Sequence, residues 1–285
     1  MKFRWWLYLI LGSIISGLIH WLTFPATSQS EISYQVYQQP NSTVHVITIP
    51  ADSNYLITPQ ISTVGNLQTL DSFVTEHKAI ASINGGYFDP NNTKTTSYII
   101  QQGELVADPR TNERLIDNPD LKIYMGKILN RGEFRRYLCD SKNRYDITFH
   151  YSPIPPNCEL KDAIGAGPQI LPIDRSVTEG FVAHDETGKV IRNAIGTTSP
   201  NARSAIAITE KGDIILVMVA QSPGKLGMSL ADLGDFLEDL GVIKAINLDG
   251  GSSSALHYQG KTFYGKIDKE GNPVIRHLKS VLLVH

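Results

Sequence analysis

Two segments of this chain share one residue pattern, and that pattern restricts the fold more than any other feature. The segments run over residues 66–86 and 229–251. In each, apolar residues recur at intervals of three and four, as one buried helix face requires, and a short apolar run follows. Each segment then ends in a Gly-Gly turn that an asparagine opens. Matched pairs keep one constant offset: Asn66 and Ser229, Leu67 and Leu230, Leu70 and Leu233, Phe73 and Phe236, Val74 and Leu237, Ile80 and Ile243, Ile83 and Ile246, Asn84 and Asn247.

The pattern predicts two pseudo-equivalent helix–strand–Gly-Gly units whose strand ends converge on one cleft. Asn66 and Ser229 are suitable N-caps, and Asp232 completes a capping box with Ser229. Gly241 is placed to end the second helix. The alternative is that two unrelated helix–strand units resemble each other by convergence.

The turn Asn247-Leu248-Asp249-Gly250-Gly251-Ser252-Ser253-Ser254 carries most of the chemistry. It places a carboxylate, two glycines and three hydroxyls in a row after a strongly apolar run. Glycines let the backbone approach a ligand, and adjacent N–H groups in such a turn can bind an anion. Asn84-Gly85-Gly86-Tyr87-Phe88-Asp89 is its counterpart. If both turns line one cleft, we expect at least one glycine in each to hold a positive φ. Plain hairpin turns are the alternative.

The rest of the sequence predicts an α+β fold with a twisted mixed or antiparallel sheet and few helices. Hairpins are expected at 97–107 and at 204–220, with a closing strand at 281–284. Residues 108–160 look least regular. Their cationic side chains are interpreted as a solvated face, or alternatively as an insertion that favours anionic substrates. The Gly165–Gln169 stretch is either a tight turn at a cleft or an ordinary loop before a strand.

The N-terminus differs from the rest of the chain. Lys2 and Arg4 precede an apolar segment, Trp5–Phe24, which is typical of a signal peptide or of a single membrane anchor. We therefore expect residues 1–30 to be a leader or anchor with its linker. We expect residues 31–285 to form the functional domain and to be exported to the periplasm, to the outer face of a membrane or to the outside of the cell.

Cys139 and Cys158 fit an exported chain, where two cysteines at close spacing form one disulfide. Two free buried thiols are the alternative. No cysteine or histidine spacing indicates zinc. The net charge of −2 gives no indication of a nucleic-acid partner.

Several motifs in order resemble the phosphodiester glycosidase family over about residues 40–285. This family includes the lysosomal uncovering enzyme and exported bacterial proteins linked to exopolysaccharide metabolism. The chain departs from the family pattern at Ser252, where a third glycine is frequent, and at Ala207, where a glycine often stands. The motifs are Asn84–Phe88, Gly165-x-Gly167-Pro168, Arg203–Ile206, Gly227–Leu230 and Asn247–Ser253.

The resemblance implies hydrolysis of a sugar-1-phosphodiester, which needs a carboxylate near the anomeric carbon and an anion clamp. Asp249 is the first candidate carboxylate and Asp89 the second. Arg203 is the candidate phosphate clamp, because guanidinium binds phosphate oxygens bidentately. The expected substrate contacts are Asn84, Gly85, Gly86, Tyr87, Gly167, Asn247, Gly250, Gly251, Ser252 and Ser253.

Alternatives stand beside these roles. Asp89 also suits an Asx turn before Pro90, and Arg203 also suits an ion pair with Asp249. A carbohydrate-binding or envelope-assembly protein would use the same cleft without turnover. A serine hydrolase would use Ser252, Ser253 or Ser254 with His184, His257 or His277, although the Gly-x-Ser-x-Gly elbow is absent. No cofactor is expected. A calcium ion is a further alternative, because Asp89, Asp249 and asparagine side chains are oxygen ligands, but their spacing matches no known loop and no metal is assigned.

Overall fold

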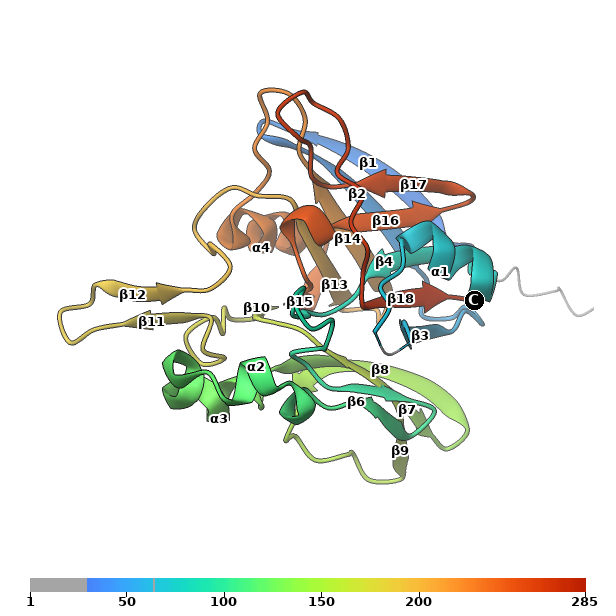
Figure 1. The fold of residues 1–285 in the computed structure, drawn as a ribbon. Coiled ribbons are helices and arrows are strands. Elements are labelled where there is room, and N and C mark those ends of the chain that lie inside the picture. The colour runs from blue at the N-terminus through green and yellow to red at the C-terminus, as the bar shows by residue number, and fades with distance from the viewer. Residues whose placement is uncertain (1–29, 64) are drawn as a thin grey trace, which may run out of the picture.

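The computed structural model describes residues 30–63 and 65–285, and the fold is α+β, as the sequence predicts (Figure 1). Three antiparallel sheets and one projecting hairpin account for the named strands. Alternating or fully buried apolar strands of this kind pack face to face, which produces a layered core.

The largest sheet has six strands in the order β1-β2-β14-β13-β15-β10. Its centre is the predicted hairpin β13–β14, and every residue of these two strands is buried. β15 continues the second repeat unit and ends at Asn247. The strands are β1 Ser33–Gln39, β2 Ser42–Ile49, β10 Gln169–Leu171, β13 Arg203–Thr209, β14 Ile214–Ala220 and β15 Val242–Asn247.

The second sheet has five strands in the order β17-β16-β4-β18-β3. β4 belongs to the first repeat unit and ends at Asn84, and β18 is the predicted closing strand. The two repeat units therefore lie in different sheets. The strands are β3 Ile57–Ile61, β4 Ala81–Asn84, β16 Ala255–Tyr258, β17 Lys261–Tyr264 and β18 Ser280–Val284.

The third sheet corrects the expectation that residues 108–160 are irregular. It has the order β6-β5-β9-β7-β8, and its long strands come from that region. These strands carry charged side chains at buried positions, such as Glu133, Arg135 and Asp162, so the sequence shows no apolar strand pattern there. β11 Val182–His184 and β12 Val190–Asn193 form a separate projecting hairpin (Figure 1). The strands of the sheet are β5 Ile99–Gln101, β6 Glu104–Ala107, β7 Gly132–Cys139, β8 Lys142–Phe149 and β9 Cys158–Gly165.

The two repeat helices cover their own sheets. α4 (Leu230–Asp239) starts at the predicted capping box of Ser229 and Asp232, and Gly241 follows it with φ +75°. α1 (Leu70–His77) starts one turn later than predicted, because Thr69 and not Asn66 is its N-cap. The remaining helices are η1 Pro109–Thr111, α2 Glu113–Ile116, η2 Pro119–Tyr124, α3 Met125–Ile128 and η3 Gly251–Ser253.

Three apolar clusters hold these layers together. The largest lies between the sheets and includes Ile83, Ile164 and Ile206. A second packs α4 against the six-stranded sheet, and a third packs α1 against the sheet that contains β18. Each repeat helix thus buries its apolar stripe on the outer face of its own sheet, which fixes the strand that follows.

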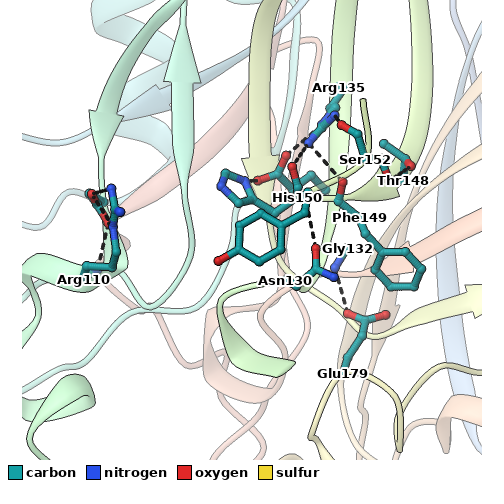
Figure 2. Close-up of polar contacts among 12 residues, drawn as sticks. Arg110, Asn130, Gly132, Arg135, Thr148, Phe149, His150, Ser152 and Glu179 are labelled. Carbon is teal, nitrogen blue, oxygen red and sulfur yellow. Dashed lines mark hydrogen bonds and ion pairs between the residues drawn. The ribbon is translucent and has the colours of Figure 1, made fainter. Parts of the chain in front are cut away.

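The cationic residues of 108–160 are not one solvated face. Arg135 is buried and bonded: its Nε donates to Glu133 Oε2 at 2.8 Å, and its Nη atoms donate to the carbonyls of Phe149 and Ser152, both at 3.0 Å (Figure 2). Arg136 pairs with Asp162, and Arg131 is buried as well. Burial of these charges is compatible with stability because partners satisfy them.

Cys139 and Cys158 form the predicted disulfide, which joins paired positions of β7 and β9. Within the residues that the structure describes, no helix is long and apolar enough to cross a membrane. The apolar segment Trp5–Phe24 lies outside those residues.

Candidate active site

The two Gly-Gly turns meet, as the repeat pattern predicts. The N–H of Asp249 donates to the carbonyl of Gly85 at 3.0 Å, and Asn84 Nδ2 donates to the carbonyl of Asp249 at 2.6 Å. β4 and β15 belong to different sheets, so these two bonds join the sheets at their strand ends. The main chain of Asp249 is thereby held against the first turn.

Asn84 is the buried connector of this junction. Its Oδ1 accepts from Ser204 Oγ at 2.7 Å and from the N–H of Ala255 at 3.1 Å. The side chain has no exposed surface, and both ends of its amide are bonded within the protein. Its geometry therefore describes a residue that positions the turns and does not touch a ligand directly.

A pocket of about 180 Å³ opens beside the junction. That is smaller than the roughly 300–1,000 Å³ of pockets for drug-sized ligands, so it suits one small polar group such as a sugar ring or a phosphate. Six of its lining residues were predicted from the sequence, and Ile195 and Asn201 were not. The predicted six are Tyr87, Arg203, Asn247, Asp249, Gly250 and Gly251.

Asp249 is the one carboxylate that lines this pocket. Burial raises its pKa to about 6, opposed by hydrogen bonds from the Ser253 hydroxyl and the Gly250 N–H and by the charge of Arg276. A carboxylate with a pKa close to neutral can hold or release a proton during a reaction. Asp249 is therefore the strongest candidate for chemistry in the pocket.

Asn247 and Tyr87 form a polar wall around Gly167. Asn247 Nδ2 donates to the Tyr87 hydroxyl at 2.7 Å, and that hydroxyl donates to the carbonyl of Gly167, also at 2.7 Å. Burial and the charge of Asp249 raise the pKa of Tyr87, so this hydroxyl keeps its proton. Asn247 Oδ1 is buried without a hydrogen-bond partner among the described residues. An unmet buried acceptor is costly, and a donor that reached it from the pocket would satisfy it.

Glu179 supports this wall from behind, and no local sequence pattern marks it as a site residue. Its carboxylate accepts from the N–H of Gln169 at 2.7 Å and from the N–H of Gly132 at 2.9 Å. The first bond fixes the chain just after Gly167, and the second fixes Gly132, whose carbonyl accepts from the N–H of Ala166 just before it. The carbonyl of Gly167 faces Tyr87 and Asn247. The Gly165–Gln169 stretch is therefore a turn at the pocket.

Arg203 lines the pocket, but most of the N–H donors of its guanidinium are bonded to main-chain carbonyls. Nε donates to Met228 at 3.1 Å, and the Nη atoms donate to Ile195, Gly196 and Ser199 at 3.1, 2.6 and 2.9 Å. It forms no ion pair with Asp249 within the described residues, so that alternative is not what the structure shows. Burial lowers its pKa, because a buried cation is poorly solvated.

Asp89 lies outside the pocket. Its Oδ1 accepts from the N–H of Asn91 at 2.8 Å, which is the Asx turn that the sequence also suggested. Its Oδ2 pairs with Arg114 Nε at 2.7 Å. These bonds account for Asp89 as a turn residue, and we give it no catalytic step.

The glycines of the two turns differ in why glycine is needed. Gly251 has the expected positive φ of +60°, but neither Gly85 nor Gly86 has one, so that prediction was wrong for the first turn. There, close packing requires glycine: a Cβ on Gly86 would overlap the carbonyl oxygen of Gly165. The N–H groups of Gly85 and Gly251 are also already bonded, to Ser280 and Ala202 carbonyls, and are not free for a ligand.

The serines do not form a hydrolase dyad. Ser253 supports Asp249, Ser252 does not line the pocket, and no serine–histidine hydrogen bond occurs within the described residues. His257 bonds instead to Thr262 at 2.6 Å. The described chain also has no group of three or more His, Cys, Asp or Glu side chains that could hold a metal ion.

Three arginines act on this site by charge. Arg131 and Arg203 oppose the rise in the pKa of Tyr87, and Arg276 opposes the rise in the pKa of Asp249. None of the three pairs with a carboxylate within the described residues. Arg131 and Arg276 were not predicted as site residues, because nothing in their local sequence separates them from other surface arginines. Only the fold brings them to Tyr87 and Asp249.

The fold is shared with solved structures of low sequence identity. A hypothetical protein from Synechocystis has a TM-score of 0.59 at 16% identity; the match covers 89% of this chain but only 62% of that one. A putative exported protein from Burkholderia pseudomallei K96243 has a TM-score of 0.61 at 14% identity, with 85% and 74% covered.

The catalytic domain of zebrafish N-acetylglucosamine-1-phosphodiester alpha-N-acetylglucosaminidase, auto-inhibited by its pro-peptide, has a TM-score of 0.60 at 18% identity, with 90% and 82% covered. No curated protein sequence matches this chain significantly. The sequence model described as phosphodiester glycosidase matches residues 77–285, which include both turns, the pocket residues and all three arginines. The match spans most of the chain, and the protein therefore belongs to the phosphodiester glycosidase family.

Proposed function

We propose that this protein hydrolyses a sugar-1-phosphodiester, with Asp249 as the reacting carboxylate. One observation carries the proposal: the carboxylate that lines the pocket is buried and has a pKa near 6, and the guanidinium of Arg203 lines the same pocket without an ion pair to a carboxylate among the described residues. Unneutralised positive charge in a partly buried pocket attracts an anionic substrate and stabilises negative charge that develops on it.

In the proposed reaction, Asp249 removes a proton from a water molecule whose oxygen bonds to the anomeric carbon, or it attacks that carbon itself to form a glycosyl ester that water then hydrolyses. The bond between the anomeric carbon and the phosphate oxygen breaks, and its electron pair stays on that oxygen. The released phosphate monoester is already stable as an anion, so the reaction does not need a strong second acid. This agrees with a pocket that one carboxylate lines and with the place of Asp89 outside it.

Asn247 and Arg203 take supporting roles in this proposal. Asn247 Oδ1 accepts a hydrogen bond from a hydroxyl or N–H of the sugar, which meets its unmatched acceptor. Arg203 holds the segment 195–199 through its carbonyl bonds, so that Ile195 and Asn201 shape the pocket. Its positive charge still acts on the pocket.

The test is a screen of purified protein against sugar-1-phosphodiesters and uncharged aryl glycosides, with released sugar measured. We expect turnover of phosphodiesters and its loss in Asp249→Asn. Binding of a sugar phosphodiester without turnover would instead indicate a carbohydrate-binding or envelope-assembly role. Inhibition by a fluorophosphonate would indicate a serine hydrolase.

We also propose that the domain works outside the cytoplasm. The charged and apolar N-terminus motivates this, and the Cys139–Cys158 disulfide is the kind of bond that oxidising compartments keep. The expected result is that protease added to intact cells, or to spheroplasts of a double-membrane cell, degrades the domain. A protected domain that carries free thiols would contradict export.

A further inference from the structure

Arg203 cannot bind a phosphate bidentately in this structure. A guanidinium has five N–H donors in a fixed fork, and four of those of Arg203 already point at main-chain carbonyls. A bidentate contact needs two parallel donors on one side of the fork. If the substrate carries a phosphodiester, another cation must contact its oxygens.

Arg276 has the free donors that Arg203 lacks. Its guanidinium lies over the ring of Phe88, with Cζ 5.7 Å from the ring centroid. Among the described residues it forms no side-chain hydrogen bond and no ion pair. It is partly buried, so water solvates it less than an arginine that stands free on the surface.

Arg276 does not itself line the pocket, but it lies beside the segment that forms the pocket wall. Phe88, on which it rests, directly follows Tyr87, a residue of the pocket wall. The chain after Arg276 enters β18, which pairs with β4 and so with the strand that ends at Asn84. The charge of Arg276 reaches Asp249 and lowers the pKa of that carboxyl against the effect of burial.

We propose that Arg276, held on the face of Phe88, is the residue that binds the phosphate oxygens of the substrate. The aromatic ring holds the guanidinium in place by a cation–π contact, so less side-chain freedom is lost when an anion binds. This inference rests on the proposed function for the identity of the substrate, but its central claim is about anion binding and can be tested without turnover.

The first test measures binding of inorganic phosphate and of methyl phosphate to the full-length protein by calorimetry. We expect Arg276→Gln to weaken binding about 10- to 100-fold, as the loss of a charge-assisted pair should. Arg276→Lys keeps the charge but loses the fork, and should weaken binding less. Lys269→Gln is the matched control, because it removes one exposed positive charge from the same loop, and should leave binding unchanged.

The second test compares kcat/KM for a sugar-1-phosphodiester and for an aryl glycoside of the same sugar. Arg276→Gln should lower the first value at least 10-fold more than the second. Arg203→Lys should lower both alike, since its role is to hold the pocket wall. For the phosphodiester, the kcat/KM of Phe88→Leu should lie between those of wild type and Arg276→Gln.

The outcomes separate the two proposals. If no phosphodiester is cleaved but phosphate binds in an Arg276-dependent way, the proposed function fails and the anion site stands. If phosphodiesters are cleaved and Arg276→Gln binds phosphate as wild type does, the anion site fails. Wild-type protein that binds neither phosphate nor methyl phosphate also overturns it. If Arg276→Gln does not fold, Arg276→Lys binding phosphate as tightly as wild type overturns it in the same way.

Discussion

The two Gly-Gly turns come from matching sequence units, yet the structure uses them differently. In the first turn, Gly85 and Gly86 fit against other parts of the protein: a Cβ on Gly85 would lie 2.5 Å from Ser280 Oγ, and one on Gly86 would meet Gly165. In the second turn, Gly251 has φ +60° and faces the pocket, where the atom nearest to an added Cβ is Asn201 Nδ2 at 3.7 Å. Glycine is required by packing in one turn and by backbone conformation in the other.

The same division separates the two asparagines. Asn84 is bonded at both ends of its amide and joins the turns, whereas Asn247 keeps an unmatched Oδ1 in the pocket wall. The first unit therefore acts as the support and the second as the reacting surface. Sequence similarity between the units predicts where they meet but does not show which one carries the chemistry.

The largest expected effect comes from the carboxylates of the two turns. Asp249→Asn should lower kcat/KM on a sugar phosphodiester by about 10²- to 10⁴-fold, as expected for loss of a base or nucleophile. Asp89→Asn is the matched control and should change kcat/KM only a few-fold. Steady-state kinetics with circular dichroism of both variants checks this. Equal losses in two well-folded variants would remove the distinction between the turns.

The glycines give the next effect, and it differs in kind. Gly86→Ala forces a Cβ onto the Gly165 carbonyl and should cost about 1–3 kcal/mol of stability or more. Gly251→Ala has room but an unfavourable φ, and should cost about 1–2 kcal/mol while raising KM. Denaturant unfolding and kinetics on each variant separate the two. A Gly86→Ala protein of normal stability with raised KM would place the first turn at the ligand as well.

The asparagines should show a smaller contrast. Asn84→Ala leaves the Ala255 N–H and the Asp249 carbonyl without their partner, and should cost about 1–3 kcal/mol in stability. Asn247→Ala should mainly raise KM, by about 10-fold, because a substrate donor loses its acceptor. Thermal melting and KM measurements on both variants show whether each asparagine affects stability or substrate binding. If Asn84→Ala raised KM while melting normally, Asn84 would contact substrate.

The sequence was sufficient for the fold class, for the meeting of the two turns and for most of the pocket. Those features depend on local patterns such as helix periodicity, a capping box and Asn-Gly-Gly turns, which survive in one sequence. The roles of Arg131, Arg276 and Glu179 depend on contacts between distant segments, and no local pattern marks them. Two strands of the third sheet, β5 and β6, are the predicted hairpin at 97–107. The other three were missed because buried partners such as Glu133 allow charged side chains inside those strands.

The smallest expected effect is a shift with pH, and it bears on Asp249 alone. Burial places the folded pKa of Asp249 at about 6, above its ordinary value of 3.8. Since the carboxylate is the reacting form, kcat/KM should fall as pH drops below about 6. The folded state binds this proton more tightly than the unfolded state, so stability falls as pH rises from about 4 to 6. Asp249→Asn removes that loss, and its melting temperature should exceed that of wild type by more at pH 7.5 than at pH 5. Asp89→Asn, which breaks the pair with Arg114, should show no such gain. A gain in both variants would mean that general charge repulsion, and not the burial of Asp249 at the pocket, sets the pH dependence.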